Sequence, residues 1–383
     1  MKIAFAGDVV LAGDLLDSDM SPLRLPAWEA ADARIVNLEH PISDHARPIK
    51  TGMLHAPTRA LKPLTTLGVT AVSLANNHIH DMGTKGIADT RAALAAAGIA
   101  GFGAGQTIAQ ARAPLWLDER LCVLAYCDTA PHMHQVWPAG DDAPGVNPLR
   151  LEAIMADLQG LRDDQRAILF LHWGRENVWH PPACDVALAR RLLAEPKVAL
   201  IVASHAHRLQ GALRRNGKRA FMGLGNFLVP NFFLGPRFTL VPRPAPGSVW
   251  RTTTLIYNVA APTYITWRRA NRQSGIVVFD SDTGEARLHT AVQAADAPRL
   301  APLAGPARAW LRARTGLLGA ALALPAPLYR LVAGLNALWS AAGWHLHMAW
   351  MLSCPPAGDG GLKPLAGLTW LARRAGLIRR RKS

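Results

Sequence analysis

The segment Val198–His207 reads VALIVASHAH, an apolar run that is followed at once by Ser204, His205, Ala206 and His207. Short apolar runs that end in polar residues are typical of buried strands. His205 and His207 share one side of an extended turn, because alternate residues of an extended chain point the same way. Imidazole is a common ligand of transition metals, so the pair is a candidate metal site. Pairs with this spacing also occur without a metal, and this one needs support from elsewhere in the chain.

The same pattern recurs along the first 230 residues. Five further apolar runs predict buried strands: Ile3–Ala6, Ala33–Leu38, Val69–Leu74, Leu121–Tyr126 and Ala167–Leu171. Alanine-rich segments with helical periodicity lie between them: Gly86–Ala97, Leu149–Leu161 and Asp185–Leu193. This alternation predicts an α/β fold built around a sheet.

Residues that can bind a metal or transfer a proton follow several of these predicted strands. They are Asp8, Glu39, Asn77 with His78, and His172. Ligands of α/β sheets commonly bind beyond the carboxyl ends of the strands, so these side chains are expected to converge. A carboxylate can bridge two cations, an amide offers a neutral oxygen, and a histidine beside the metal can protonate a leaving group. Asp8 and Asn77 alone would suit turns or helix caps equally well, and it is the recurrence that favours a site.

Composition excludes several classes of protein. The chain has 383 residues, of which 50% are hydrophobic and 18% charged, so it is neither disordered nor collagen-like and can bury a sizeable core. Its four cysteines have no CxxC spacing, which favours reduced thiols. The net charge of +15 is concentrated in residues 301–383, which hold eleven Lys and Arg against one acid. No nucleotide-binding or nucleic-acid-binding motif is visible, so we expect no nucleic-acid partner.

Two parts of the chain are predicted from these shifts in composition. Residues 1–296 form the main domain, with an insertion or long loop at about 235–272, where five prolines and six arginines follow no period. A strand–turn–strand hairpin is predicted at 275–292. Residues 297–383 form a basic, apolar and helical tail. The opening sequence MKIAFAGD predicts a strand rather than an export signal, so we expect the main domain in the cytoplasm.

Residues 331–356 of the tail contain no acid, lysine or arginine. Three structures are compatible with this segment: a spanning helix, a helix lying in the membrane interface, and helices packed on the core. Interspersed tryptophans favour the interfacial helix, with the basic segment Arg373–Lys382 drawn to anionic lipid. A helical hairpin around Pro325 and Pro355, packed on the protein, is the alternative. We expect peripheral attachment at the inner face of the cell membrane.

The ordered set of motifs resembles one known family. The motifs are Asn37-Leu38-Glu39, Ala75–Gly83 (ANNHIHDMG), His172–Glu176 (HWGRE), Ser204–Gln210 (SHAHRLQ) and Gly223–Phe227 (GLGNF). Together they resemble the CapA family of poly-γ-glutamate and capsule synthesis proteins, which is similar to the calcineurin-like metallophosphoesterases. The resemblance covers roughly residues 1–230.

The resemblance implies a layered αββα sandwich of the metallophosphoesterase type, here with an extra C-terminal helical tail. It implies one or two divalent ions of the Mn, Fe or Zn type, with the ligands Asp8, Glu39, Asn77, His172, His205 and His207. By it, His78 is the general acid and is held by Asp81. Lys50, Glu176 and Asn226 contact the ligands or the substrate, and Arg175 suits a polyanionic substrate.

Two departures from the family pattern bear on function. Val10 stands where calcineurin-like enzymes usually carry a histidine, and Glu39 stands where they carry an aspartate, which leaves one metal position short of a ligand. Two hypotheses follow. The first is a metal-dependent hydrolase of a phosphoester or a γ-glutamyl or acyl bond, acting on an anionic polymer or phosphoester in capsule or surface-polymer biosynthesis. The second is a non-catalytic accessory subunit of a membrane-bound polymer synthase. The presence of both His78 and Asp81 favours the enzyme.

Overall fold

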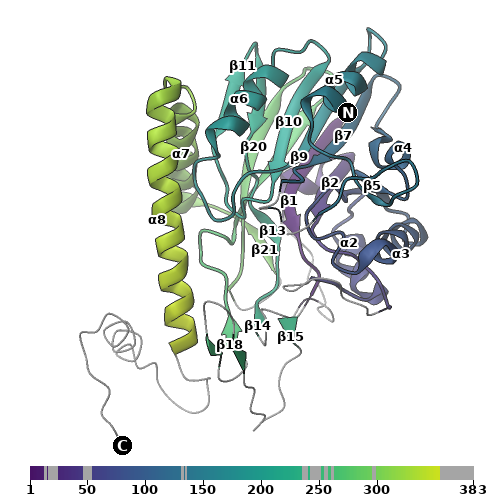
Figure 1. Cartoon of the computed structure of the whole chain (residues 1–383). Coiled ribbons are helices and arrows are strands. Elements are labelled where there is room, and N and C mark those ends of the chain that lie inside the picture. The colour runs from purple at the N-terminus through teal and green to yellow at the C-terminus, as the bar shows by residue number, and fades with distance from the viewer. Residues whose placement is uncertain are drawn as a thin grey trace, which may run out of the picture.

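Two β-sheets form the centre of the molecule, seen in Figure 1 of this computed structural model. The structure describes residues 1–12, 15, 25–45, 54–130, 133, 136–234, 240–241, 252–253, 258–259, 263–295 and 299–353. The first sheet has the order β21 (Leu300–Pro302), β20 (Ala286–Gln293), β19 (Gln273–Asp280), β1 (Lys2–Val9), β2 (Ala33–Leu38), β3 (Ala71–Ser73), β4 (Ala100–Phe102), and β13 (Asn226–Leu228) also pairs with β1.

The second sheet is built from the middle of the chain. Its order is β11 (Ala212–Arg215), β12 (Lys218–Phe221), β10 (Val198–Ser204), β9 (Arg166–His172), β7 (Leu121–Cys127), β6 (Leu115–Trp116). In both sheets the central strands that alternate with helices are parallel, as β1–β2–β3–β4 and β7–β9–β10. The mixed α/β class predicted from the sequence is confirmed, and all six predicted strands and the 275–292 hairpin are present within one or two residues at most ends.

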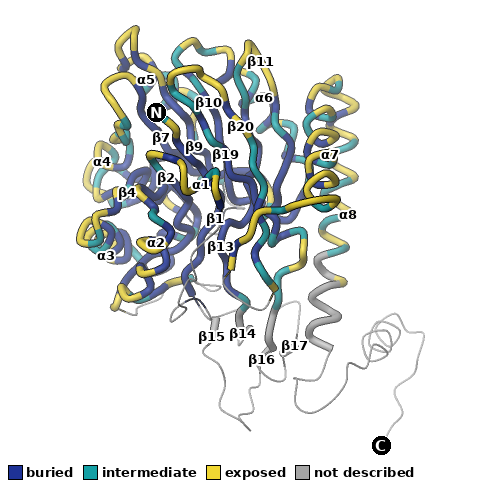
Figure 2. Tube along the Cα trace, turned by 180° about the vertical axis from the view of Figure 1, so that it is seen from behind, coloured by how far each residue is buried: buried dark blue, intermediate teal, exposed yellow. Residues whose placement is uncertain are grey.

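The helices cover the sheets. They are α1 (Pro26–Glu29), the 3-10 turn η2 (Thr58–Leu61), α2 (Lys62–Thr66), α3 (Gly83–Ala96), α4 (Ile108–Arg112), α5 (Leu151–Gly160) and α6 (Ala183–Leu192). The main hydrophobic core joins the two sheets, where the rings of Phe5 and Phe170 meet edge to face with centroids 6.1 Å apart. A second core packs α5 and α6 against the other face of the second sheet. Figure 2 shows the buried strands at the centre and the exposed helix faces outside.

The insertion predicted at about 235–272 contains more regular structure than expected. Where the structure describes it, the chain forms short antiparallel strands: β14 (Phe232–Leu234), β15 (Leu240–Val241), β16 (Thr252–Thr253), β17 (Asn258–Val259) and β18 (Thr263–Ile265). The prolines and arginines hid these strands, because two- and three-residue strands leave no periodic pattern in a sequence. A further two-stranded sheet pairs β5 (Ala104–Gly105) with β8 (Gly145–Val146).

The C-terminal part forms a helical hairpin, α7 (Gly305–Ala321) and α8 (Ala326–Ser353), which turns at Pro325. Its inner face packs on the second core through Leu322, Tyr329 and Ala333. The Tyr329 hydroxyl donates a hydrogen bond to the Pro181 carbonyl over 2.8 Å. The hairpin is therefore docked on the sandwich, as the packed-hairpin alternative predicts.

Close backbone approach positions α7. A Cβ atom on Gly211, beside β11, would lie 2.4 Å from the Gly319 nitrogen of α7, so only glycine allows this contact. Arg314 of α7 adds a cation–π contact, with its guanidinium carbon 4.2 Å from the Trp179 ring centroid. Among the described residues, no helix is both long and apolar enough to cross a membrane.

Candidate metal centre

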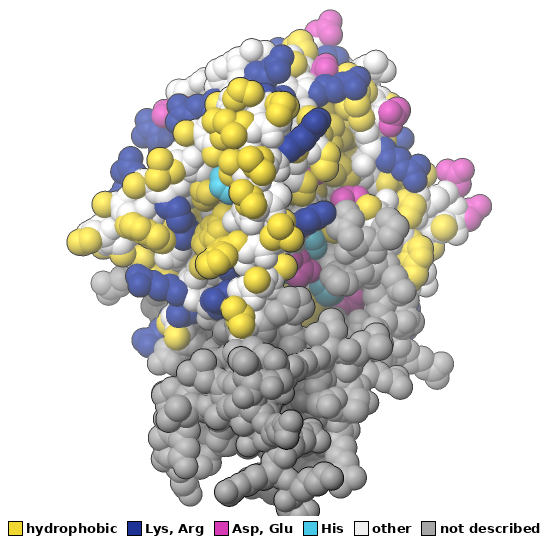
Figure 3. All heavy atoms as spheres, turned by 60° about the vertical axis from the view of Figure 1, so that its left-hand side comes forward, with side chains coloured by type: hydrophobic (Ala, Val, Ile, Leu, Met, Phe, Trp, Pro, Cys, Tyr) yellow, Lys and Arg dark blue, Asp and Glu magenta, His cyan; other side chains and the backbone are white. Residues whose placement is uncertain are grey.

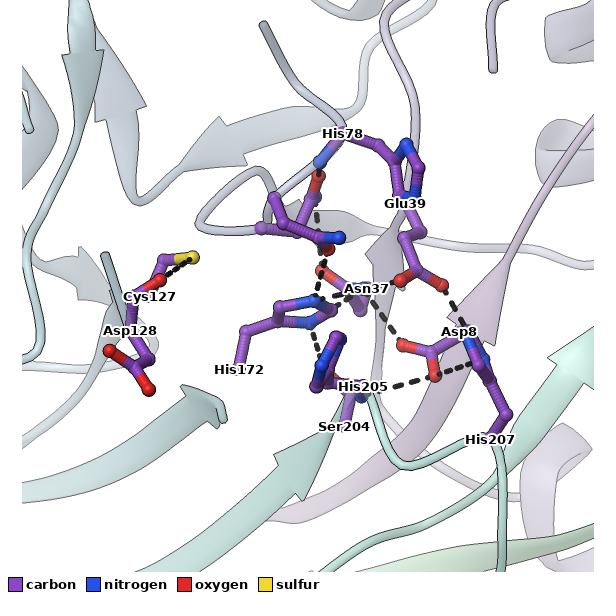
Figure 4. A network of polar contacts seen from close by, with 12 residues as sticks. Asp8, Asn37, Glu39, His78, Cys127, Asp128, His172, Ser204, His205 and His207 are labelled. Atoms are coloured by element: carbon purple, nitrogen blue, oxygen red, sulfur yellow. Dashed lines mark hydrogen bonds and ion pairs between the residues drawn. The ribbon is translucent and has the colours of Figure 1, made fainter. Parts of the chain in front are cut away.

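The carboxyl ends of the parallel strands bring the predicted ligands to one place (Figure 4). Asp8 near the end of β1 lies in register with Asn37 of β2 and with Asn226 of β13. His172 ends β9 in register with Ser204, the last residue of β10. The two sheets therefore present one end to a common space, although the contributing residues are up to about 200 positions apart in sequence.

Two ligand sets share one carboxylate. Glu39, His172 and His205 have potential ligand atoms within 4.8 Å of one another, and so do Asp8, Glu39 and His207. Glu39 belongs to both sets, which is the arrangement expected of a ligand that bridges two cations. Asn77 joins the first set, because its Oδ1 lies 2.8 Å from His172 Nε2.

The contacts within the centre are short and buried. Glu39 Oε1 lies 3.6 Å from His172 Nε2, and Glu39 Oε2 lies 3.8 Å from His207 Nδ1. Asp8 Oδ2 lies 3.4 Å from His207 Nδ1 and accepts a hydrogen bond from the His205 backbone nitrogen over 3.2 Å. The rings of His172 and His205 lie 4.8 Å apart. Six side chains from five segments therefore surround one small volume.

The backbone at the centre is strained where the ligands project. His205 has a φ of 87° and His207 a φ of 51°, in a region that non-glycine residues seldom adopt. This turn aims both imidazoles at the carboxylates. Gly7 makes room for the first ligand strand, because a Cβ atom there would lie 1.8 Å from the Gly225 carbonyl oxygen.

Burial controls the protonation of the centre. Burial lowers the pKa of His205 to about 4 and moves the pKa of His172 well below its usual value. Burial and the charge of Asp8 raise the pKa of Glu39 well above its usual value. Burial also lowers the pKa of His207, but the Glu39 and Asp8 carboxylates more than offset this and raise it to about 10. His172 and His205 are therefore neutral at pH 7, which is the form that binds metal.

The donor set fits divalent cations. Asp8 and Glu39 are both fully buried, and neither oxygen of Glu39 accepts a hydrogen bond within the described part of the chain. His205 Nδ1 likewise has no hydrogen-bond partner there. Buried carboxylates without donors are costly, and a bound cation would remove that cost. Imidazole, carboxylate and amide ligands together suit ions of the Mn, Fe and Zn type.

His78 lies beside this centre and is held by Asp81. His78 Nδ1 lies 2.7 Å from Asp81 Oδ2, and Asp81 is buried while His78 is 15% exposed on its side chain. The same carboxylate oxygen accepts a hydrogen bond from the Leu54 nitrogen over 2.7 Å, which holds it in place. With Nδ1 engaged, Nε2 is the atom through which His78 can exchange a proton.

Val10 occupies an apolar cluster instead of a ligand position. It packs with Ala12 and Val229, against Leu54 and Trp267. The Trp267 ring lies 5.7 Å from the His207 ring, so the cluster lines the side of the centre that holds His207. Asp8, Glu39 and His207 still form a ligand set without a contribution from residue 10.

The four remaining predicted residues are distributed differently. Asn226 is buried, and its Oδ1 lies 2.8 Å from His207 Nδ1, so it orients that ring. Glu176 is half-buried and its charge acts on Glu39, His205 and His207, whereas Arg175 is exposed and acts on Asp185 instead. Lys50 lies outside the described residues.

Sequence reasoning missed the residues that orient the ligands. Asn37 Nδ2 donates to Asp8 Oδ1 over 2.8 Å, and Ser204 Oγ lies 2.9 Å from His172 Nδ1. Asn76 Nδ2 donates to the Leu38 carbonyl over 2.7 Å and so joins the loop of Asn77 to the end of β2. All three stand inside the motifs that were recognised. Their polar character directly next to a ligand was the available signal.

Comparison with known proteins shows the family. Residues 2–231 match the family described as bacterial capsule synthesis protein PGA_cap, and the chain belongs to it. The predicted resemblance to the CapA proteins, and through them to the metallophosphoesterases, is confirmed.

Named relatives match over about half their length. A probable polyglutamine synthesis accessory protein of Mycobacterium tuberculosis is 31% identical over 175 residues, 43% of this chain and 46% of the relative. The PGA biosynthesis protein CapA of Bacillus subtilis is 25% identical over 211 residues, 53% of this chain and 54% of its own. The capsule biosynthesis protein CapA of Bacillus anthracis is 25% identical over 209 residues, 50% and 49% of the two chains.

Proposed function

We propose that the protein is a metal-dependent hydrolase that acts on a phosphoester or on a γ-glutamyl or other acyl bond in capsule or surface-polymer biosynthesis. The observation that carries the proposal is Glu39, a buried carboxylate without hydrogen-bond donors that belongs to two ligand sets. The two facing sheets with helices outside agree with an αββα sandwich of the metallophosphoesterase type. Membership of a capsule synthesis family supports the biological setting.

The residues divide into ligands and a proton donor. Asp8, Glu39, Asn77, His172, His205 and His207 would hold the cations. When bound, such cations supply Lewis-acid charge and lower the pKa of water. Asn37, Ser204 and Asn226 keep the ligand side chains in place through the hydrogen bonds described above. His78, oriented by Asp81, would protonate the leaving group through Nε2.

The His78–Asp81 pair distinguishes this proposal from a purely structural metal site. A structural site is closed by its ligands and needs no acid–base pair at its side. Here the imidazole is partly exposed while its partner carboxylate is buried, so the pair is held toward the solvent side of the centre. Figure 3 shows acidic and histidine side chains in a hollow of the surface.

The test combines metal content with turnover. The purified protein is loaded with Mn²⁺, Fe²⁺ or Zn²⁺, its bound metal is measured by elemental analysis, and phosphoesters and γ-glutamyl peptides are screened as substrates. The proposal requires stoichiometric metal and turnover that His78→Ala removes and the exposed-site control His45→Ala does not. A metal-loaded protein without turnover on either class would favour the accessory-subunit alternative, which the printed name of the mycobacterial relative also supports.

We also propose that the protein attaches peripherally to a membrane through its C-terminal part, residues 297–383, with a synthase as its partner there. Eight of the ten exposed large hydrophobic side chains among the described residues lie on α7 and α8. Leu328, Leu331, Leu335 and Leu338 form a stripe along one side of α8. Figure 3 shows these hydrophobic side chains with Lys and Arg around them. This pattern suits a helix lying in a membrane interface.

Point variants test this attachment better than a deletion. Removing residues 310–383 would also remove Leu311, Leu322 and Tyr329, which are buried. Leu331→Gln with Leu335→Gln should instead reduce sedimentation with anionic vesicles while leaving the thermal midpoint nearly unchanged. Unchanged sedimentation of this double variant, or a wild-type protein that ignores such vesicles at low salt, would contradict the attachment.

A further inference from the structure

A second concave site lies far from the metal ligands in the fold, between the outer strands of the two sheets. A cavity of about 1180 Å³ is bordered by β20, by the β11–β12 hairpin and by α7. Leu213, Phe221 and Ile276 contribute buried apolar side chains to its lining. None of its lining residues belongs to the metal centre. Its volume is at the upper end of the roughly 300–1000 Å³ of ordinary ligand sites.

Five arginines from three elements line this cavity. They are Arg214 and Arg219 of the β11–β12 hairpin, Arg287 of β20, and Arg308 and Arg312 of α7. The lining has one acid, Glu285, and two hydrogen bonds of 2.9 and 2.8 Å already tie it to Arg287. Within the part of the chain that the structure describes, the other four arginines form no ion pair with a carboxylate.

The four unpaired arginines form two like-charged pairs. Arg214 and Arg219 lie directly opposite each other in the antiparallel register of β11 and β12. Arg308 and Arg312 are four residues apart on α7 and therefore lie on one face of the helix. Like charges at either spacing repel and destabilise the element that carries them. Both pairs face the same cavity, where a bound anion would turn repulsion into attraction.

Other groups register the same positive field. Burial lowers the pKa of His289 in the cavity wall, and the charges of Arg308 and Arg287 lower it further. Burial also lowers the pKa of Arg219, and the charge of Arg214 adds to that shift. The cavity is electropositive from two opposite walls.

We propose that this cavity binds an extended chain carrying several carboxylates and so holds an anionic polymer away from the metal centre. One small anion cannot serve both pairs, because Arg308 and Arg312 span about 6 Å along the helix and the other pair lies on a different element. The planar guanidinium fork matches a carboxylate with two parallel hydrogen bonds. The choice of carboxylates over phosphates rests on the proposed function in anionic-polymer metabolism.

The experiment measures binding of fluorescein-labelled poly-γ-glutamate to the full-length protein by fluorescence anisotropy. Arg308→Gln with Arg312→Gln should weaken binding by about tenfold or more, since each charge-assisted hydrogen bond contributes on that scale. The matched control, Arg120→Gln with Arg191→Gln, removes the same charge from exposed positions elsewhere and should change affinity less than twofold. Arg214→Gln, on the opposite wall, should weaken binding as well, and thermal melts verify that each variant is folded.

Several results would overturn the proposal. The cavity double variant could bind the polymer as tightly as the wild type, or the wild type could fail to bind it. Polyphosphate of equal charge could bind more tightly than the polymer and lose affinity in the same variants, which would refute the carboxylate assignment. His205→Ala separates the two sites: retained polymer binding in this variant supports the cavity, and lost binding there with full binding in the arginine variant refutes it. Because no turnover is measured, failure of the hydrolase proposal leaves the result unaffected.

Discussion

The first 230 residues and the hairpin α7–α8 are both rich in apolar residues, but they use them differently. In the strands of the two sheets nearly every apolar side chain is buried. On α8, Tyr329 and Ala333 are buried, whereas Leu335 is 59% and Trp339 is 77% exposed. A strand between two covering layers has no free side, but a helix that packs with one face leaves the other for another environment. Apolar content alone therefore does not indicate where a segment ends up.

The largest expected effect tests the centre of the first region. Glu39→Ala removes the carboxylate that both ligand sets share, so bound metal should fall to almost none and turnover should be lost with it. Elemental analysis and the substrate screen measure the two quantities. Glu119→Ala, an exposed carboxylate elsewhere, is the control. Full metal occupancy in Glu39→Ala would refute the bridging assignment.

The next effect separates proton transfer from metal binding. His78→Ala should lower turnover by about 10²–10⁴-fold, the usual range for a general acid, and leave metal content intact. His207→Ala should instead lower metal content, because this residue belongs to a ligand set. If His78→Ala empties the site, the roles assigned to the two histidines are wrong.

A matched pair of leucines tests the two faces of the hairpin. Leu322 is fully buried, so Leu322→Ala should lower the free energy of unfolding by about 2–5 kcal/mol. Leu335→Ala changes an exposed side chain and should stay within about 0.5 kcal/mol of the wild type. Chemical denaturation gives both values. Equal losses would mean that the outer face of α8 is covered in solution.

The smallest expected effect concerns pH and the helix that supports the hairpin. Burial raises the pKa of Asp185 in α6 to about 7, and the charge of Asp128 adds to the shift. The folded protein therefore binds this proton more tightly than the unfolded chain, so stability should fall as pH rises from about 4 to 7. The slope due to this group is at most about 1.4 kcal/mol per pH unit. Asp185→Asn should flatten it, and an unchanged pH profile in denaturation would contradict this account.

Local pattern predicted much of the first region. Ala33–Leu38 and Val198–Ala203 are continuous apolar runs of strand length, and such runs are strands when both faces are covered. The candidate ligands were accessible for the same reason, since each stands directly after a strand. The residues that orient them were not singled out, because Asn37 and Ser204 look like ordinary strand-end residues until the register places them beside Asp8 and His172.

Tertiary packing decided the rest. The strands β14–β18 are too short for a periodic signal, and the docked face of α8 depends on Pro181 and Asn336, which sequence does not connect. The arginine-lined cavity joins residues 214 and 312, whose proximity exists only because Gly211 lets α7 approach β11.

The sequence by itself determined the class of fold, the strand ends and the chemical types of the ligands, because strand length, apolar runs and side-chain chemistry are local properties. Only the tertiary structure decided that Glu39 stands between two ligand sets, that α7 and α8 bury one face and expose the other, and that four arginines share one cavity. Those features depend on distances between segments far apart in the chain, and such distances arise when the sheets and helices pack.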